Sequence, residues 1–246
     1  MYLPSPPHFM DIEHKIQQSI LLKLIHIPEA SFTELLGDDR DSNKFAYHIG
    51  VLETKNLILK KDGRYSLSPE GRKLSAFIEG DTGTKAAFPT FAVVLIIKDG
   101  DRILTQRRLK EPFYGYWGLI SGKINFGFNI EECAKRDIEE EAGITADNAR
   151  LIGVNQAKTF EDDELLHHHI MFFVELTGIS GTLKETTHKG ENRWMTIEEF
   201  KTKERFPDPW LKTIWNSRGF VNIETDRMMK DGKFVDCILK RMDKVQ

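Results

Sequence analysis

The sequence predicts an α/β (α+β) protein made of two domains. Before residue 80, apolar residues recur mainly at helical spacing, whereas strand-like apolar runs appear after residue 88. A small, polar segment, "EGDTGTKAAFP" at residues 79–89, lies between these parts and has the composition of a linker. The length of 246 residues is comfortable for two domains, which agrees with this division.

The composition is that of a soluble globular protein. Hydrophobic residues make up 40% of the chain, and the formal net charge of −3 gives no sign of a strongly basic nucleic-acid binder. The two cysteines, Cys133 and Cys237, are far apart, which favours a reducing, cytoplasmic location. The longest clean apolar run, "FAVVLII" at 91–97, is far shorter than the ~20 residues that span a bilayer. We therefore expect no membrane association.

The first 80 residues predict four helices and a two-stranded hairpin. Apolar residues at i, i+4 spacing indicate an amphipathic helix over 11–26. Ser31 and Glu34 have capping-box spacing for a short second helix, and a third helix is expected over 43–56. "LILKKDGRYSLS" then reads as two strands around an Asp-Gly turn, and Pro69 is well placed to begin a fourth helix.

This order resembles that of winged helix-turn-helix domains over about residues 11–78. The resemblance implies contacts with double-stranded DNA from the third helix and from the hairpin, at Asn43, Lys44, Tyr47, His48, Lys60, Lys61 and Arg64. Residues 1–80 hold 10 Lys and Arg against 11 Asp and Glu, a balance that weakens the electrostatic case for DNA. Protein contact is the alternative, and a homodimer is possible because winged-helix proteins often read paired half-sites.

The rest of the chain predicts strands on either side of an acidic helix. Two strands flank the Asp-Gly turn at 99–100, "HHIMFFVEL" is an apolar strand, and "DPWLKTIWNSRG" predicts a closing helix. The tail, 220–246, has the pattern of a hairpin across Asp231-Gly232. The expected domains are therefore 1–80, a linker at 81–88, 89–218, and a C-terminal extension at 219–246.

The acidic helix is expected between Asn129, a good N-cap, and Gly143, a natural stop. On a helical wheel, Asp137 and Glu141 lie at the edge of the apolar stripe, with Glu140 beside them. Carboxylates crowded at a partly buried edge repel each other, and a hard cation such as Mg²⁺ relieves that repulsion. The alternative is an ordinary solvated face with i, i+4 ion pairs.

The segment "GKINFGFNIEECAKRDIEEEAGI" resembles the Nudix box, and the resemblance covers about residues 88–217. It implies an α/β/α sandwich with a mixed sheet, and hydrolysis of a nucleoside diphosphate linked to another group. It also implies Mg²⁺ or Mn²⁺ bound by Asp137, Glu140, Glu141 and the Ser121 carbonyl, with Glu191 as a further acid. Arg136 would orient the acids, and Glu140 or Glu141 would hold or deprotonate the attacking water.

The segment departs from the box at two acidic positions. Phe128 replaces its first glutamate, and Asp137 replaces the glutamate after the arginine. These departures keep a second function open, in which a DNA-binding transcriptional regulator uses a degenerate Nudix domain to sense a nucleotide-like effector.

Further residues are candidates for binding a nucleotide-type substrate. Arg107 and Arg108 end a predicted strand near the site and are candidates for phosphate contacts. Tyr114, Tyr116 and Trp117 are candidates for stacking on a base, with loop or core packing as the alternative.

Overall fold

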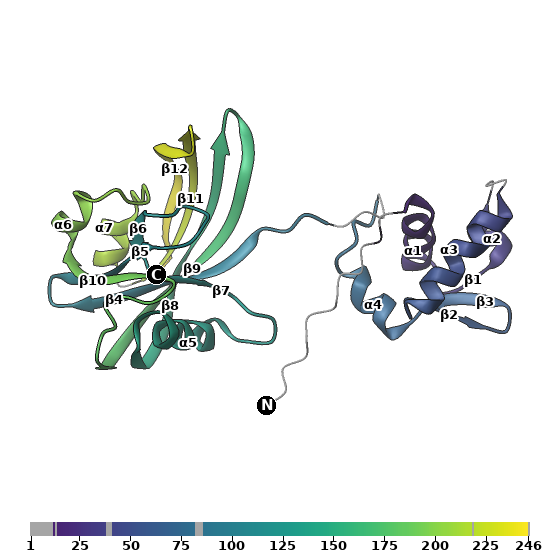
Figure 1. Ribbon diagram of the computed structural model, residues 1–246, viewed down its shortest axis with the longest axis horizontal. Helices are drawn as coiled ribbons and strands as arrows, with labels where there is room; N and C mark the ends of the chain where they lie inside the picture. The colour runs from purple at the N-terminus through teal and green to yellow at the C-terminus, as the bar shows by residue number, and fades with distance from the viewer. Residues whose placement is uncertain (1–11, 13, 38–40, 82–85, 218, 246) are drawn as a thin grey trace. The chain divides into compact units, whose positions relative to one another are not determined.

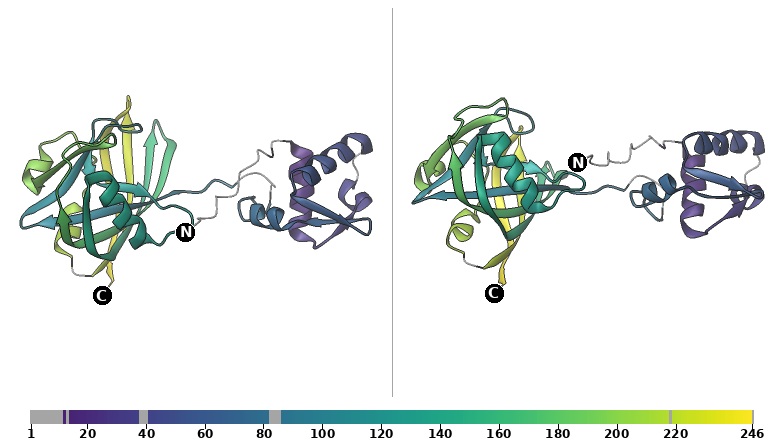
Figure 2. Two further views of the ribbon diagram at one scale, coloured as in Figure 1. Left: turned by 60° about the horizontal axis from the view of Figure 1, so that its bottom comes forward. Right: turned by 90° about the horizontal axis from the view of Figure 1, so that it is seen from below.

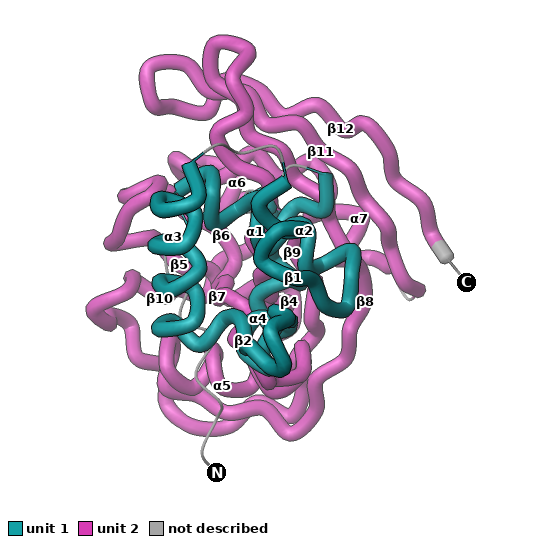
Figure 3. Tube along the Cα trace, turned by 90° about the vertical axis from the view of Figure 1, so that its right-hand side faces the viewer, with its two compact units in different colours: residues 1–88 teal, residues 89–246 magenta. Residues whose placement is uncertain are grey.

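The chain forms two compact units, Met1–Phe88 and Pro89–Gln246, in a computed structural model (Figure 3). The structure describes residues 12, 14–37, 41–81, 86–217 and 219–245. Residues 82–85 of the predicted linker, and residues 11 and 13 of the first predicted helix, lie outside this description. None of the helices that the structure describes is long and apolar enough to cross a membrane.

The first unit contains the elements expected from the sequence, together with one short additional strand. They are α1 (Lys15–His26), β1 (Ala30–Ser31), α2 (Phe32–Leu36), α3 (Ser42–Thr54), β2 (Ile58–Lys61), β3 (Arg64–Leu67) and α4 (Pro69–Ser75). The three strands pair in the order β1-β3-β2. Local chemistry explains the boundaries: Ser31 and Glu34 form the expected capping box, and positive φ angles at Asp62 and Gly63 close the hairpin.

The second unit is built on one large mixed sheet (Figure 1). Its elements are β4 (Thr90–Asp99), β5 (Arg102–Arg108), β6 (Trp117–Leu119), β7 (Ser121–Lys123), α5 (Ile130–Ala142), β8 (Ile144–Glu161), β9 (Glu164–Gly181), β10 (Gly190–Thr196), α6 (Ile197–Lys201), α7 (Leu211–Asn216), β11 (Phe220–Lys230) and β12 (Lys233–Val245). The main strand order is β10-β5-β4-β9-β8-β11-β12. Strands β4 and β9 run parallel, as do β8 and β11, so the sheet is mixed as predicted.

Helices cover both faces of this sheet, which confirms the expected sandwich (Figures 1 and 2). Strand β4 explains the layering because successive side chains point to opposite faces. Val93 and Leu95 pack in the core under α5, whereas Val94 and Ile96 pack in the core that includes Trp210 just before α7. A strand buried on both faces is apolar throughout, as the run at 91–97 is.

The C-terminal hairpin forms as expected, but it is part of the main sheet. Strand β11 pairs with β8 in parallel over Val221–Met229, and β12 pairs with β11. Val221 and Ile223 are fully buried in the core beside α7. The hairpin therefore adds buried surface to the second unit.

Candidate active site

The acidic helix α5 carries the predicted carboxylates and is held by local signals at both ends. The Asn129 backbone N–H donates to Glu132 Oε2 at 2.8 Å, and Gly143 ends the helix with a φ of 69°. Asp137 and Glu141 are buried, at 5% and 4% exposure, and Glu140 beside them is exposed. Two of the three candidate ligands thus lie deeper than the edge position that the helical wheel predicts.

Asp137 lies directly behind strand β7. A Cβ atom added to Gly122 would come within 1.8 Å of Asp137 Oδ2, so only glycine fits at this position. Asp137 Oδ1 accepts a hydrogen bond from Arg136 at 2.6 Å, whereas Oδ2 is buried with no hydrogen-bond partner among the described residues. Burial raises the pKa of Asp137 above its usual value, with Arg136 opposing the shift and the neighbouring carboxylates adding to it.

Glu140 and Glu141 share one cation, the side chain of Lys189. The Lys189 Nζ atom lies 3.1 Å from an oxygen of each glutamate. Burial lowers the pKa of Lys189, but hydrogen bonds to both carboxylates outweigh it and raise the pKa overall. The other Glu141 oxygen accepts from Gln106 Nε2 at 3.1 Å, and the Asn192 side chain donates to the Glu141 carbonyl at 2.7 Å.

Phe128, which stands in place of an acid in the box, contacts the helix through Arg136. The Arg136 guanidinium lies over the Phe128 ring, 5.2 Å from its centre. The guanidinium reaches Asp137 from this position and approaches Glu140 at 3.9 Å. The aromatic ring therefore supports the arginine that holds Asp137.

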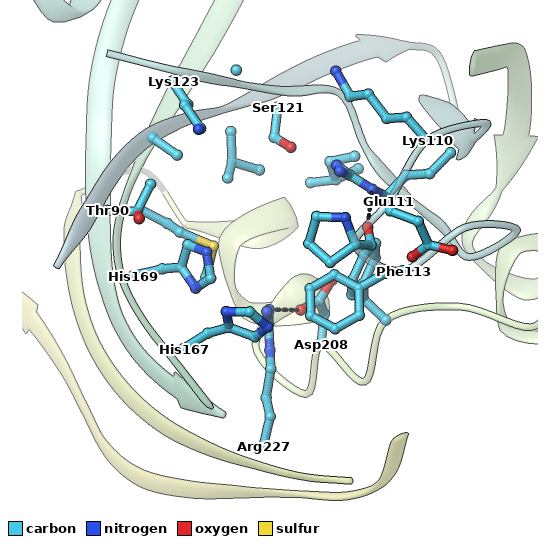
Figure 4. A pocket seen from close by; sticks show the side chains of 18 of the residues that line it. Thr90, Lys110, Glu111, Phe113, Ser121, Lys123, His167, His169, Asp208 and Arg227 are labelled. Atoms are coloured by element: carbon cyan, nitrogen blue, oxygen red, sulfur yellow. Dashed lines mark hydrogen bonds and ion pairs between the residues drawn. The ribbon is translucent and has the colours of Figure 1, made fainter. Parts of the chain in front are cut away.

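A cavity of about 530 Å³ opens on the other side of β7 from Asp137, and Ser121 and Gly122 form part of its wall. Its cationic lining residues are Arg108, Lys110, Lys123 and Arg227, and His167, His169, Phe113, Phe206 and Asp208 also line it (Figure 4). His167 and His169 both face the cavity because alternate residues of β9 point to one side. Burial, reinforced by Arg227, lowers the pKa of His169 to about 4, so this side chain is neutral at physiological pH.

The far end of the cavity contains a buried ion pair. Arg227 on β11 donates to Asp208 Oδ1 at 2.8 Å, and both side chains are at most 8% exposed. Burial raises the pKa of Asp208, with the charge of Arg227 opposing the shift. The Arg227 Nε, His169 Nδ1 and Trp210 Nε1 atoms have no hydrogen-bond partner in the described part of the chain, although all three residues line the cavity.

Only some of the predicted substrate-binding residues line the cavity. Arg108 lines the cavity, whereas Arg107 points away and lies 3.5 Å from Glu191. Trp117 is packed in the core. Tyr116 is buried against Phe234, and its hydroxyl oxygen accepts a hydrogen bond from the Phe234 backbone N–H. The aromatic rings in the cavity are instead those of Phe113, Phe206 and Trp210, while Tyr114 is 57% exposed.

Glu191 also lies apart from the predicted metal ligands. In the β10–β5 register, Glu191 is opposite Arg107 and Asn192 is opposite Gln106. Because successive residues alternate faces, Asn192 and Gln106 point to Glu141, and Glu191 points to the other side of the sheet. Sequence analysis missed Gln106, Asn192 and Lys189 because no local motif links them to the acidic helix.

The chemistry of the acidic residues fits a divalent cation, but the acids are not gathered around one point. Among the described residues, no three His, Cys, Asp or Glu side chains are gathered as a ready metal site. Two observations nevertheless fit a cation: Asp137 Oδ2 is buried without a partner, and the Lys189 ammonium already bridges Glu140 and Glu141. All the donors are carboxylate oxygens, which Mg²⁺ and Mn²⁺ prefer.

In the first unit, the predicted DNA contacts are only partly available. Asn43, Lys44 and Tyr47 are exposed on α3, and Lys60 and Lys61 are exposed on β2. His48 is 6% exposed and hydrogen-bonded to Gln17, so it is buried, although its ring lies against that of the exposed Tyr47. Arg64 forms ion pairs with Glu29 at 2.8 Å and with Glu34 at 3.3 Å, which neutralise its charge.

Known proteins resemble the second unit. The NUDIX domain profile matches residues 88–214. The chain is 32% identical over 133 residues to an oxidized purine nucleoside triphosphate hydrolase of Danio rerio, covering 52% of this chain and 81% of that protein. It is 33% identical over 96 residues to an ADP-ribose pyrophosphatase of Methanocaldococcus jannaschii, covering 39% of this chain and 55% of that protein. The match to a third relative, from Bacillus subtilis (strain 168), spans 64% of that protein's length.

A solved structure shows the same fold. The crystal structure of a MutT protein from Bacillus halodurans covers 61% of this chain and 97% of its own, with a TM-score of 0.52 at 23% identity. Because the match to the NUDIX domain spans more than half of the 246 residues, the chain belongs to the NUDIX family, whose box the acidic segment resembles.

Proposed function

We propose that the chain is a Mg²⁺- or Mn²⁺-dependent hydrolase that cleaves a diphosphate linkage in a nucleoside diphosphate derivative. One observation carries this proposal: the buried Asp137 lies directly behind Gly122, and Gly122 forms part of the wall of a cavity whose lining includes cationic and aromatic side chains as well as Glu111 and Asp208. The negative charge of a diphosphate is stabilised by nearby cationic groups. A nucleoside binds against apolar and aromatic side chains.

The cation would be held by Asp137, Glu140 and Glu141. When bound, it would neutralise diphosphate charge and lower the pKa of a water molecule. Arg136 holds Asp137 in position, whereas Lys189 lies between the two glutamates, where a metal ion would have to displace it. Glu140 is the exposed member of the set, which makes it the candidate to hold or deprotonate the attacking water.

Phosphate oxygens would contact the cationic side chains of the cavity. Arg108, Lys110 and Lys123 lie in its walls together with Ser121 and Gly122 (Figure 4). An arginine presents several N–H donors in one plane, which suits phosphate oxygens. These side chains would bind the charged part of the substrate beside β7, the strand that lies between the cavity and Asp137.

The heterocyclic base would bind at the end that holds Asp208 and Arg227. Phe113 and Phe206 supply ring surfaces, their centres 5.5 Å apart. The Asp208 carboxylate accepts hydrogen bonds and the Arg227 guanidinium donates them, so the pair presents both kinds of polar group to a base edge. The neutral His169 adds a third polar group beside them.

A substrate screen tests the proposal. The full chain would be assayed with Mg²⁺ and with Mn²⁺ on ADP-ribose, other nucleotide sugars, dinucleotides and nucleoside triphosphates. We expect turnover of at least one class, and a fall in kcat of about 100-fold or more for Glu140→Gln. Glu139→Gln is the matched control, because Glu139 is exposed on the solvated side of the same helix. Absence of turnover throughout, or equal activity of both variants, would exclude the hydrolase.

A second function remains a candidate on account of helix α3. Tyr47 is 67% exposed there, on the same helix as the exposed Asn43 and Lys44, and a large exposed aromatic ring near a basic and an amide side chain is suited to a nucleic-acid surface. In this function the first unit is a winged helix that binds double-stranded DNA, and the Nudix domain senses a nucleotide-like effector.

A gel shift on the DNA upstream of the protein's own coding sequence tests the regulator. We expect a salt-sensitive, sequence-specific shift that changes with the nucleotide and is weakened by Lys44→Glu. Glu53→Lys, at the other end of α3, is the charge-change control. Failure to shift any fragment, with or without nucleotides, would rule this function out.

A further inference from the structure

Strand β12 forms one end of the large sheet. In the described part of the chain it pairs with β11 alone, so its outer edge carries no neighbouring strand (Figure 1). Three large apolar side chains on this strand are exposed, Val235 at 63%, Ile238 at 45% and Leu239 at 41%. An unpaired edge with exposed apolar side chains is a template for pairing with another strand.

A second copy of β12 can pair with this edge in the antiparallel direction. Two-fold symmetry then limits the registers that the two strands can adopt. Hydrogen-bonded and non-hydrogen-bonded pairs alternate along an antiparallel ladder. A two-fold axis makes each pair i–j identical to the pair j–i. The axis therefore cannot relate two neighbouring pairs, because one of them is hydrogen-bonded and the other is not. One residue must therefore lie opposite its own copy, and the choice of that residue fixes every other pair.

The register centred on Ile238 is complementary in charge. Lys233 then lies opposite Asp243, and Asp236 lies opposite Lys240, and the two-fold axis repeats each pair. Opposite charges facing each other across a ladder stabilise the pairing. Ile238, one of the exposed apolar residues, meets its own copy at the centre.

The neighbouring registers lack this complementarity. Centring on Asp236 or Lys240 puts two like charges opposite each other at the axis. Centring on Cys237 puts Lys233 opposite Arg241, and centring on Leu239 leaves no pair of opposite charges. Like charges directly opposite are destabilising, so one register is preferred.

The central pairs of this register lie between the two bulges of β12, whereas Lys233, Lys240 and Asp243 lie at or beyond the bulges. The β11–β12 ladder shifts between Glu224 and Thr225 and between Met228 and Met229, which leaves the extra residues Lys240 and Val235 on β12. The segment between them, 236–239, pairs regularly with β11. The central pairs, which involve residues 237–239, fall inside this regular segment.

We propose that the chain forms a homodimer by antiparallel pairing of two β12 strands, with Ile238 opposite its own copy. The pairing joins the two large sheets edge to edge and covers the exposed apolar residues of β12. It is separate from the hydrolase proposal, because the dimer is defined by the outer edge of β12 and the catalytic carboxylates lie on α5.

A cysteine cross-link tests the central residue in the full chain. Ile238→Cys would be made in a Cys237→Ser background, which leaves Cys133, a buried residue, as the only native thiol. Residues directly opposite in a ladder have Cβ atoms about 4.5–5.5 Å apart, close enough for a disulfide after a small shift. We expect an oxidised dimer on a non-reducing gel. Lys233→Cys is the control, since its copy would lie about ten residue positions away along the strand.

Charge exchange tests the register by sedimentation velocity. We expect the wild type to sediment as a dimer. Two double variants, Asp236→Lys/Asp243→Lys and Lys233→Glu/Lys240→Glu, should each be monomeric. In a dimer of either variant, the residues opposite each other across the ladder would carry like charges. An equimolar mixture of the two should recover the dimer. A monomeric wild type, variants that dimerise as the wild type does, or a mixture that stays monomeric would overturn the proposal.

Discussion

At the scale of single residues, Asp137 combines a proposed role in binding a cation with a cost in stability. Its Oδ2 atom is buried and lacks a partner among the described residues, and burial raises its pKa. A buried polar group without a hydrogen bond costs about 1–3 kcal/mol. The position is therefore one where function and stability oppose each other.

We expect Asp137→Asn to increase the free energy of unfolding at pH 7 by on the order of 1 kcal/mol while abolishing hydrolysis. The sign follows from the raised pKa: the folded chain binds this proton more tightly than the unfolded chain does. The wild type thus loses stability relative to the variant as pH rises through the folded pKa. Denaturant unfolding at pH 7 and at acid pH measures the difference. A variant that is less stable at pH 7 would contradict this account.

Lys189 competes with any cation for the same two carboxylates. Its Nζ atom is 3.1 Å from both Glu140 and Glu141. Removing its charge with Lys189→Met should tighten Mn²⁺ binding on the order of tenfold, which corresponds to about 1.4 kcal/mol. Titration followed by electron paramagnetic resonance measures the dissociation constant.

Lys135→Met is the control for this measurement. Lys135 is on the same helix, but its Nζ atom donates to the Asp147 carbonyl, away from the carboxylates. It therefore removes the same charge from another face of α5. Equal Mn²⁺ affinities of the two variants would show that Lys189 does not occupy the cation site.

At the scale of elements, the site depends on the close approach of strand β7 to helix α5. Gly122 makes this approach possible, because a Cβ there would collide with the Asp137 carboxylate at 1.8 Å. We expect Gly122→Ala to displace Asp137 or β7 and to lower kcat by at least about tenfold, with a loss of stability of about 1–3 kcal/mol. Activity assays and thermal unfolding measure both effects.

Gly80→Ala is the corresponding control, since nothing lies within 4 Å of a Cβ at Gly80. It should leave both activity and stability close to those of the wild type. Unchanged activity of Gly122→Ala would mean that the contact between β7 and α5 has no part in hydrolysis.

Elements that are specified locally could be predicted from the sequence. The capping box at Ser31, the N-cap at Asn129 and the turn at Asp62-Gly63 depend on residues within one turn of each other, and all three are found where expected. The partners of Glu141 could not be predicted. Gln106 precedes it by 35 residues and Asn192 follows it by 51, and only the sheet register brings them together.

The difference between local and long-range contacts also explains which aromatic rings line the cavity. From the aromatic loop that follows Arg108, the sequence suggested stacking roles for Tyr116 and Trp117, with core or loop packing as the alternative. The structure buries these rings and places Phe113, Phe206 and Arg227 at the cavity instead. Which ring of an aromatic loop faces a cavity is set by packing against distant segments, here the residues after α6 and the C-terminal hairpin.

At the scale of the whole molecule, the C-terminal hairpin extends the second compact unit beyond residues 88–214, which match the NUDIX domain. The sequence predicted a domain at 89–218 and a C-terminal extension at 219–246, and in the structure β11 contributes Val221 and Ile223 to the core and Arg227 to the cavity. Burying two such aliphatic side chains contributes about 3–6 kcal/mol. This is a large part of the 5–15 kcal/mol that stabilises a typical domain.

We therefore expect a chain of residues 89–246 to fold by itself and a chain of residues 89–218 to aggregate or remain unfolded. Without β11, strand β8 loses its parallel partner over nine residue pairs and becomes an exposed edge. Circular dichroism and an amide NMR spectrum of each chain measure folding, and the full chain is the reference. A well-dispersed spectrum from residues 89–218 would show that the domain folds without the hairpin. The hairpin would then supply Arg227 to the cavity without being needed for folding.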